Sequence, residues 1–336
     1  IMIKTFRIFG AGEWGLAVAN HLSCLDNKIE VFLRDDNKVN EYNESLFYKD
    51  LNLSFNKNII FRKLTDLNHL SDGANNFNVI ASSSSGFTDI INSHNIYFKS
   101  CESIIWLTKG LDHSKGLLFH EIIDKVLSPN IKKCIISGPS FAKDLVATKP
   151  LRVSIASTCE ILANSIIGIM ETENLKFEKT SDIIGVEISG VIKNISGILA
   201  GILTVNSYPD EYIEELISLS QKDVKNISRK ICGSQSPYMV TEEQLEATVL
   251  SPACYGDIHL TCYFNASRNR QLGLKIIGKY NIKKIITKIG TVEGYLSTST
   301  LNTHKEIFGE SKIVQAAYKI LYLDADPKTI LNQLFI

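Results

Sequence analysis

A glycine-rich turn near the start of the chain narrows the folds that are open to it. The letters GAGEWG occupy residues 10–15, directly after the short apolar stretch TFRIF and before a stretch with helical spacing of Leu16, Ala19 and Leu22. A strand, a G-x-G-x-x-G turn and a helix in this order are typical of a dinucleotide-binding βα unit. The glycines permit a tight turn and let the backbone approach a pyrophosphate at the helix N-terminus. A glycine turn in another α/β protein would show the same letters, so the rest of the chain must decide.

Strand and helix patterns alternate through the first half of the chain. Further strand-like stretches lie at residues 28–36, 78–82, 103–110, 132–138 and 152–157, and helical patterns at 114–127 and 158–171. This alternation predicts a mostly parallel sheet that is wound by helices on both sides. After about residue 185 the strand patterns fade and helical patterns follow. We therefore expect an α/β Rossmann-like, doubly wound domain over residues 1–185 and an all-α C-terminal domain over residues 186–336.

The second domain opens with an apolar run that contains a single lysine. In VEISGVIKNISGILAGI, residues 186–202, a helical wheel places the large aliphatic residues on one half and the small residues on the other half with Lys193. Each glycine weakens a helix by roughly 0.5–1 kcal/mol relative to alanine, so three on one face indicate a close backbone or ligand. We expect this face to pack close to the first domain. A surface lysine that snorkels from a half-buried helix is the alternative.

Composition argues against several classes of protein. Lys plus Arg (36) balances Asp plus Glu (36), so there is no electrostatic case for a nucleic-acid partner or an anionic membrane. The seven cysteines are scattered, with no C-x-x-C pair and no histidines at zinc spacing, which predicts no metal site and a reducing compartment. No secretion signal is recognisable, and Lys193 and Asn194 interrupt the longest apolar run, so no transmembrane segment is expected. We expect a soluble, cytoplasmic protein.

Candidate binding residues follow several of the expected strands, where ligands of wound α/β sheets bind. Lys109 in WLTKGL comes after one strand, and SGPSFAKD after the next supplies Gly138 and Ser140. Arg34 follows the second strand, at the place where an acid favours NAD and an arginine accommodates the 2′-phosphate of NADP. The adjacent Asp35 leaves both cofactors open.

A polar stretch in the second domain has the residue types of a phosphate site. CYGDIHLTCYFNASRNRQLG contains Asp257, Thr261, Ser267, Arg268 and Asn269 near an expected helix start. Arginine, asparagine and helix-start amides are suited to hold a phosphate. A solvated loop with an arginine on a helix surface is the alternative.

The order of these motifs resembles that of the glycerol-3-phosphate dehydrogenases, in particular the bacterial NAD(P)-dependent form. GAGEWG, LTKGL, SGPSFAKD, GVEISGVIKN, GDIHLTC, SRNR and VEG follow one another over nearly the whole chain. The resemblance implies reversible reduction of dihydroxyacetone phosphate to sn-glycerol 3-phosphate with NAD(P)H, a reaction that feeds glycerophospholipid synthesis. The partner is then a small phosphorylated substrate, and we expect a homodimer.

The resemblance also implies roles for the matching positions. Lys193 matches the family's catalytic lysine, with Lys109 and Asp257 assisting it. The implied substrate residues are Lys109, Gly138, Ser140, Asp257, Thr261, Ser267, Arg268 and Asn269. The implied cofactor is NAD or NADP, with NADPH slightly favoured by Arg34, and its residues are Gly10, Gly12, Glu13, Trp14, Gly15, Arg34, Lys109, Ala142, Arg268 and Glu293.

In the implied reaction, Lys193 stabilises the charge that develops on the carbonyl oxygen and delivers the proton. Two departures from the family pattern keep other functions open. Glu13 stands where the family usually has a small residue, and residues 203–252 do not align with it. A non-catalytic or regulatory nucleotide-binding protein on the same scaffold is one alternative. A related dehydrogenase with another small phosphorylated substrate is the second.

Overall fold

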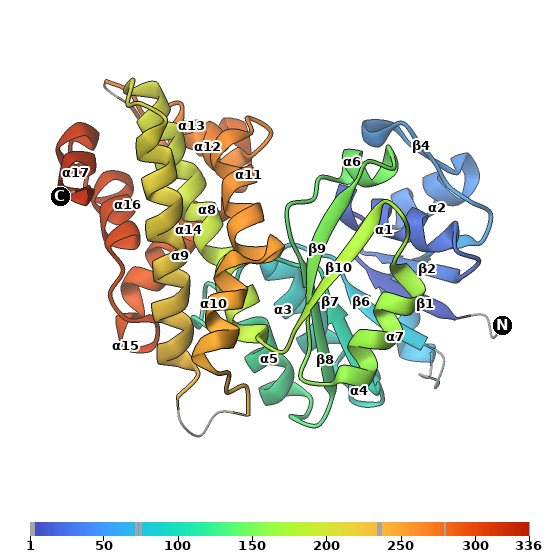
Figure 1. Cartoon of the computed structure of the whole chain (residues 1–336). Helices are drawn as coiled ribbons and strands as arrows, with labels where there is room; N and C mark the ends of the chain where they lie inside the picture. Colours follow the sequence, from blue (N-terminus) through green and yellow to red (C-terminus); the bar gives the residue numbers. More distant parts are fainter. Residues whose placement is uncertain (1–3, 71–72, 74–75, 234–236, 279, 336) are drawn as a thin grey trace. The chain divides into compact units, whose positions relative to one another are not determined.

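The chain forms two compact units in a computed structural model that describes residues 4–70, 73, 76–233, 237–278 and 280–335. The first unit comprises Ile1–Lys109 and Leu117–Ile183, and the second comprises Gly110–Gly116 and Ile184–Ile336 (Figure 1). The short segment Gly110–Gly116 thus belongs to the second unit, although the chain on both sides of it belongs to the first.

An eight-stranded sheet forms the centre of the first unit, in the order β10-β9-β8-β7-β6-β1-β2-β5. Its strands are β1 (Thr5–Phe9), β2 (Lys28–Leu33), β5 (Ile59–Lys63), β6 (Asn76–Ile80), β7 (Ser103–Trp106), β8 (Lys132–Ser137), β9 (Leu151–Ala156) and β10 (Leu175–Thr180). Neighbouring strands pair in parallel, except β8 and β9, which are antiparallel. The predicted mostly parallel sheet is confirmed. The sequence analysis missed β5 and β10.

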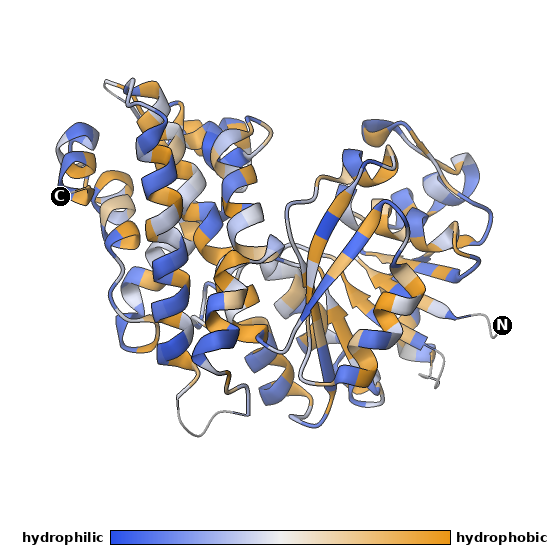
Figure 2. Ribbon diagram, in the orientation of Figure 1, coloured by the Kyte–Doolittle hydropathy of each residue, from blue (hydrophilic) through white to orange (hydrophobic). Residues whose placement is uncertain are grey.

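Helices and short elements complete the first unit. They are α1 (Glu13–Ser23), α2 (Asp36–Ser45), α3 (Ser84–Ser93), α4 (Asn95–Lys99), α5 (Phe119–Val126), α6 (Ala142–Val146) and α7 (Glu160–Met170), with the hairpin of β3 (Phe47–Tyr48) and β4 (Leu53–Ser54). Central strands such as β1 are buried along nearly their whole length, as expected for a sheet that is covered on both faces. Figure 2 shows hydrophobic residues concentrated on these strands.

The second unit is helical, and its described residues contain no strand. Its helices are α8 (Ile183–Val205), α9 (Glu211–Ile231), α10 (Glu242–Leu250), α11 (Asp257–Tyr263), α12 (Arg268–Gly273), α13 (Ile282–Ile289), α14 (Glu293–Thr303), α15 (Lys305–Phe308), α16 (Lys312–Tyr322) and α17 (Pro327–Leu334). A π-helical turn, Pro252–Gly256, precedes α11. The predicted all-α domain is confirmed. Helix α12 is short and ends at Gly273.

Helix α8 is the core helix of the second unit. It is long and apolar enough to cross a membrane by length and composition, but 83% of its most apolar window is buried inside the protein. Ile195 on its aliphatic face and Ser196 on its small-residue face are both 0% exposed. Burial of both faces explains why the run carries so few charged residues.

The small-residue face of α8 packs within the second unit. A Cβ atom on Gly201 would lie 2.4 Å from the carbonyl oxygen of Arg270 in α12, and one on Gly197 would lie 2.7 Å from Cγ2 of Thr261 in α11. The expectation that this face packs against the first domain is therefore wrong at these two glycines. Gly201 allows the backbone of α12 to come close, and Gly197 makes room for the Thr261 side chain, which larger residues would prevent.

Candidate active site

The glycine turn has two glycines that packing requires and one that faces open space. Gly10 has a φ of 117°, and a Cβ on it would lie 2.4 Å from the carbonyl oxygen of Ala81. A Cβ on Gly15 would lie 2.9 Å from the carbonyl oxygen of Gly10. Gly12, the N-cap of α1, has no atom within 4 Å of such a Cβ. The turn therefore leaves room for a phosphate to approach the first amides of α1.

Glu13 is the exposed first residue of α1, and Trp14 beside it packs partly buried against the hydrophobic core. Burial and a hydrogen bond to Asp50 are the main causes that raise the pKa of Tyr48 to about 12, and the charge of Glu13 adds to them. The Glu13 carboxylate therefore lies close enough to Tyr48 to act on its hydroxyl. A negative charge at this turn opposes the binding of an anion there.

The end of β2 presents an arginine next to two acids that have structural partners. Asp35 caps α2 by accepting hydrogen bonds from the amides of Asn37 and Lys38, and Asp36 forms an ion pair with a lysine of β5. The Arg34 side chain is 68% exposed, and its Nη1 lies 3.8 Å from a carboxylate oxygen of Asp89. Exposed pairs of this kind contribute little, so an incoming phosphate can compete for the guanidinium.

The ends of β7 and β8 bring three predicted residues together. Lys109 Nζ donates a hydrogen bond to the carbonyl oxygen of Gly138 at 2.9 Å, and Ser140 Oγ donates to the same oxygen at 3.2 Å. A Cβ on Gly138 would lie 2.9 Å from Cα of Val153, so β9 excludes a larger residue. Ala142 follows as the buried first residue of α6. The first unit thus groups Lys109 with Gly138 and Ser140, as adjacent parallel strands predict.

In the second unit, Lys193 of α8 forms an ion pair with Asp257, the first residue of α11. Lys193 Nζ donates to Asp257 Oδ1 at 2.9 Å, and the two side chains are 14% and 2% exposed. The surface-lysine alternative is therefore wrong, because the ammonium group is mostly buried beside a carboxylate. An ammonium group carries three N–H donors, and Asp257 occupies one of them.

A chain of amide hydrogen bonds connects α8, α12 and α14. Asn269 Nδ2 donates to Asn194 Oδ1 at 2.8 Å, and the backbone N–H of Gly294 donates to Asn269 Oδ1 at 2.8 Å. Asn194 in turn donates to the carbonyl oxygen of Gly190. These contacts hold Asn194, which follows Lys193, and Asn269, which follows Arg268, in one hydrogen-bond network. Sequence reasoning missed Asn194, although it directly follows Lys193.

The two arginines of SRNR have different surroundings. Arg270 is buried and donates to the carbonyl oxygen of Cys262 and to side chains of Asn265 and Thr204. Arg268 is exposed and has no carboxylate within ion-pair distance among the described residues. Ser267 caps α12 by accepting from the amide of Arg270. Arg268 is therefore the cation of this motif that an anionic ligand can reach.

Thr261 is buried on α11, where its methyl group occupies the space beside Gly197. Its position is explained by helix packing, and it separates α8 from α11 at the turn that follows Lys193.

Glu293 is the first residue of α14, and its partner was missed by sequence reasoning. His113, from the segment Gly110–Gly116, places Nε2 2.9 Å from Glu293 Oε2 and Nδ1 3.1 Å from Thr300 Oγ1. The two residues are 180 positions apart, and neither spacing nor composition links them.

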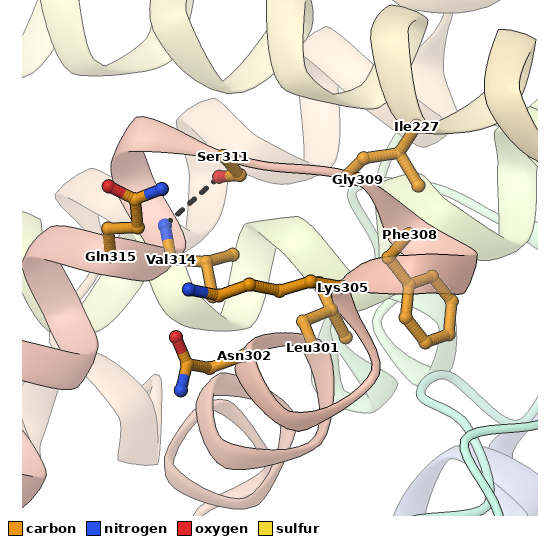
Figure 3. Close-up of a pocket in the computed structure, with 9 residues that line it drawn as sticks. All are labelled: Ile227, Leu301, Asn302, Lys305, Phe308, Gly309, Ser311, Val314 and Gln315. Atoms are coloured by element: carbon orange, nitrogen blue, oxygen red, sulfur yellow. Dashed lines mark hydrogen bonds between the residues drawn. The ribbon is translucent and has the colours of Figure 1, made fainter.

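Two hollows in the second unit contain none of the predicted site residues. One is lined by residues of α9, α14, α15 and α16 (Figure 3). Its cavity volume is about 10 Å³, which is room for about one water molecule. The other is an open groove of about 450 Å³ beside α13. Among the residues that the structure describes, no group of three or more His, Cys, Asp or Glu side chains could hold a metal ion.

Comparisons with known proteins cover both units. The family model described as NAD-dependent glycerol-3-phosphate dehydrogenase N-terminus matches residues 5–163, and the corresponding C-terminus model matches residues 182–332. A glycerol-3-phosphate dehydrogenase (NAD(P)+) of Francisella tularensis subsp. novicida is 31% identical over 340 residues, which cover 99% of this chain and 97% of the relative.

Solved structures agree with these matches. The glycerol-3-phosphate dehydrogenase of Coxiella burnetii superimposes with a TM-score of 0.86 at 25% identity and covers 99% of both chains. The enzyme of Saccharomyces cerevisiae shares the fold, with a TM-score of 0.78 at 13% identity over 99% of each chain.

Proposed function

The chain belongs to the NAD-dependent glycerol-3-phosphate dehydrogenase family, and we propose that Lys193 is the acid–base group of its reaction. The chain is an NAD(P)-dependent oxidoreductase that reversibly reduces dihydroxyacetone phosphate to sn-glycerol 3-phosphate. The observation that carries the proposal for Lys193 is its mostly buried ion pair with Asp257 at 2.9 Å.

The chemistry of the reaction explains why a buried lysine is suited to it. A bound nicotinamide cofactor would supply the hydride, and the carbonyl oxygen of the substrate would gain negative charge as the C–H bond forms. Lys193 donates a hydrogen bond to that oxygen and then transfers its proton to it, and in the reverse direction it accepts the proton. Asp257 orients the ammonium group through its 2.9 Å hydrogen bond. Low exposure makes the attraction between ammonium and oxyanion stronger than it would be in water.

In the first unit, the glycine turn binds the cofactor pyrophosphate. Gly12 leaves open space at the N-terminus of α1, and Gly10 and Gly15 keep the turn tight, which supports this role. Glu13 and Trp14 border the same turn, and Ala142 lies near the nucleotide. Lys109, with Gly138 and Ser140, contacts the substrate, and Lys109 also contacts the cofactor.

In the second unit, Arg268 binds the substrate phosphate. Its exposed guanidinium, without an acidic partner among the described residues, supports this role. Asn269, Ser267 and Thr261 shape the site around it, and Asn269 also holds Gly294, next to Glu293. Glu293 faces the cofactor. Holding the phosphate far from the reacting carbon helps to fix the geometry for hydride transfer.

Arg34 makes NADPH the preferred cofactor, because its guanidinium can bind the 2′-phosphate that NADH lacks. The protein acts in the cytoplasm as a homodimer. Free cysteines at all seven positions fit a reducing compartment. Light scattering checks the assembly, since a dimer has twice the 37.5 kDa of one chain.

The test of Lys193 is a pair of matched lysine variants. Lys193→Ala should lose most of kcat for dihydroxyacetone phosphate while still binding NADPH. Lys225→Ala is the control, because Lys225 also lies on a helix of the second unit and pairs with an acid, Glu246, whose side chain is 58% exposed, whereas that of Asp257 is 2% exposed. It should keep wild-type turnover. Normal turnover in Lys193→Ala would refute the role of this lysine.

Dihydroxyacetone without phosphate provides a test of substrate class. The wild type should turn it over far more slowly than the phosphate ester, and Arg268→Ala should remove most of that difference. Equal rates on both compounds in the wild type would refute a phosphate-binding role for Arg268.

A further inference from the structure

The segment Gly110–Gly116, which directly follows Lys109 in the chain, belongs to the second unit. Leu111 is 0% exposed. Asp112 Oδ1 accepts hydrogen bonds from the backbone N–H groups of Ser114 at 2.8 Å and Lys115 at 3.0 Å. Gly116 has a φ of 64°, and a Cβ on it would lie 2.8 Å from the ring of His304. His113 therefore projects from a turn that is fixed on both sides.

Both ring nitrogens of His113 have hydrogen-bond partners on α14. Nδ1 lies 3.1 Å from the Thr300 hydroxyl oxygen, and that hydroxyl donates to the carbonyl oxygen of Leu296 at 3.0 Å. Nε2 lies 2.9 Å from Glu293 Oε2. The ring is therefore held between Thr300 and the Glu293 carboxylate.

The contact with His113 restrains the side chain of Glu293. Glu293 begins α14, and the side chains of Glu293 and His113 are 19% and 18% exposed, so the contact is partly shielded from water. Charge-assisted hydrogen bonds are stronger than neutral ones, and shielding adds to this. His113 thus holds the Glu293 carboxylate in one orientation, while the Gly294 amide is held by Asn269.

We propose that His113 is a positioning residue, which presents the Glu293 carboxylate to the cofactor in a fixed orientation. The inference rests on the proposed function, in which Glu293 faces the cofactor. His113 does not touch the reacting atoms, so it acts on cofactor affinity and not on the chemical step. A purely structural tether would instead change stability and leave cofactor affinity as it is.

The test is steady-state kinetics with NADH and NADPH at saturating dihydroxyacetone phosphate. His113→Ala should raise the cofactor KM about 3- to 10-fold, the range expected for losing a partly buried hydrogen bond to a carboxylate. The kcat and the KM for dihydroxyacetone phosphate should stay within about twofold. His113→Gln keeps an N–H that can reach Glu293 and should restore most of the affinity.

Two further variants separate positioning from structure. Thr300→Val is the matched control, since it removes the other hydrogen bond of His113 and keeps the contact with Glu293. The cofactor KM should change by less than about twofold. In a Glu293→Gln background, His113→Ala should have no additional effect on the cofactor KM. Circular dichroism melting of each variant checks that it is folded.

Two results would overturn the role of His113. One is an unchanged cofactor KM in a folded His113→Ala variant. The other is an effect of the same size in the wild-type and Glu293→Gln backgrounds, which would show that His113 does not act through Glu293. Both presuppose an active wild type, whereas a wild type without turnover on dihydroxyacetone phosphate would refute the proposed function itself.

Discussion

Replacing Gly201 by alanine should loosen the contact between α8 and α12 and weaken phosphate binding. The added Cβ would lie 2.4 Å from the Arg270 carbonyl oxygen, and ordinary contact begins at 3.4 Å, so α12 must move by about 1.0 Å (3.4 − 2.4). The nearest atoms, from Arg270, Gly273 and Leu274, all belong to the backbone and cannot turn away as a side chain would.

Two opposing terms set the magnitude. Overpacking at a tight contact costs about 1–3 kcal/mol, and alanine in place of glycine inside a helix gains about 0.5–1 kcal/mol. The clash therefore outweighs the helix propensity, and we expect a net loss of about 1–2 kcal/mol in the free energy of unfolding. Because Arg268 begins the helix that moves, the same shift should lower kcat/KM for dihydroxyacetone phosphate by about 10- to 100-fold.

Gly168→Ala is the matched control for this change. Gly168 also lies inside a helix, α7, but nothing lies within 4 Å of a Cβ built there. Only the propensity term remains, so this variant should be more stable by about 0.5–1 kcal/mol, with unchanged kinetics. Urea denaturation followed by circular dichroism, together with initial rates, checks both variants. A Gly201→Ala variant as stable and as active as Gly168→Ala would refute the reasoning from close helix packing.

Three other changes have expected outcomes. Arg34→Gln should raise the KM for NADPH about tenfold and leave that for NADH unchanged, because the guanidinium binds the 2′-phosphate, which only NADPH carries. Equal effects on both cofactors would contradict this. Glu13→Ser should lower the dissociation constant of NADPH about two- to fivefold by removing a negative charge near the pyrophosphate, as measured by calorimetry; weaker binding would contradict it. Burial raises the pKa of Asp223 to about 6, although Ser311 donates to its carboxylate. A raised pKa favours the folded state at low pH, so the unfolding free energy should fall by about 2 kcal/mol as pH rises from 4 to 6. Urea melts of Asp223→Asn should lack this fall, and parallel pH curves for both proteins would refute it.

Local sequence was sufficient to predict most elements of the fold. The glycine turn, the alternating apolar stretches and the long apolar helix are set by residue order over five to twenty positions, and the structure contains all of them. Strands β5 and β10 were missed because Ile59–Lys63 and Leu175–Thr180 mix apolar and charged residues and lie at the two edges of the sheet. Edge strands are half exposed, so their patterns are weaker than those of central strands.

Only part of the candidate site could be predicted from the sequence. The types of the residues at Lys193, Asp257 and Arg268 indicated chemistry before any contact was known. The sequence alone could not give the ion pair of Lys193 with Asp257, 64 positions away, or the engagement of Asn269 by Asn194, 75 positions away. These hydrogen-bond partners come together only when the helices pack, and the spacing of residues along one helix does not determine which helix packs against it.

The order and type of secondary elements, the glycine turn and the family motifs were determined by the sequence itself, because each depends on neighbours along the chain. The tertiary structure determined which face of each helix packs against which neighbouring element. It placed Gly201 against the backbone of α12 within the second unit and left Arg268, not Arg270, open to an anion. It also assigned the segment with His113 to the second unit and paired it with Glu293. The physical reason is that packing and ion pairing act through space, between groups that can lie far apart along the chain, as His113 and Glu293 do at 180 positions.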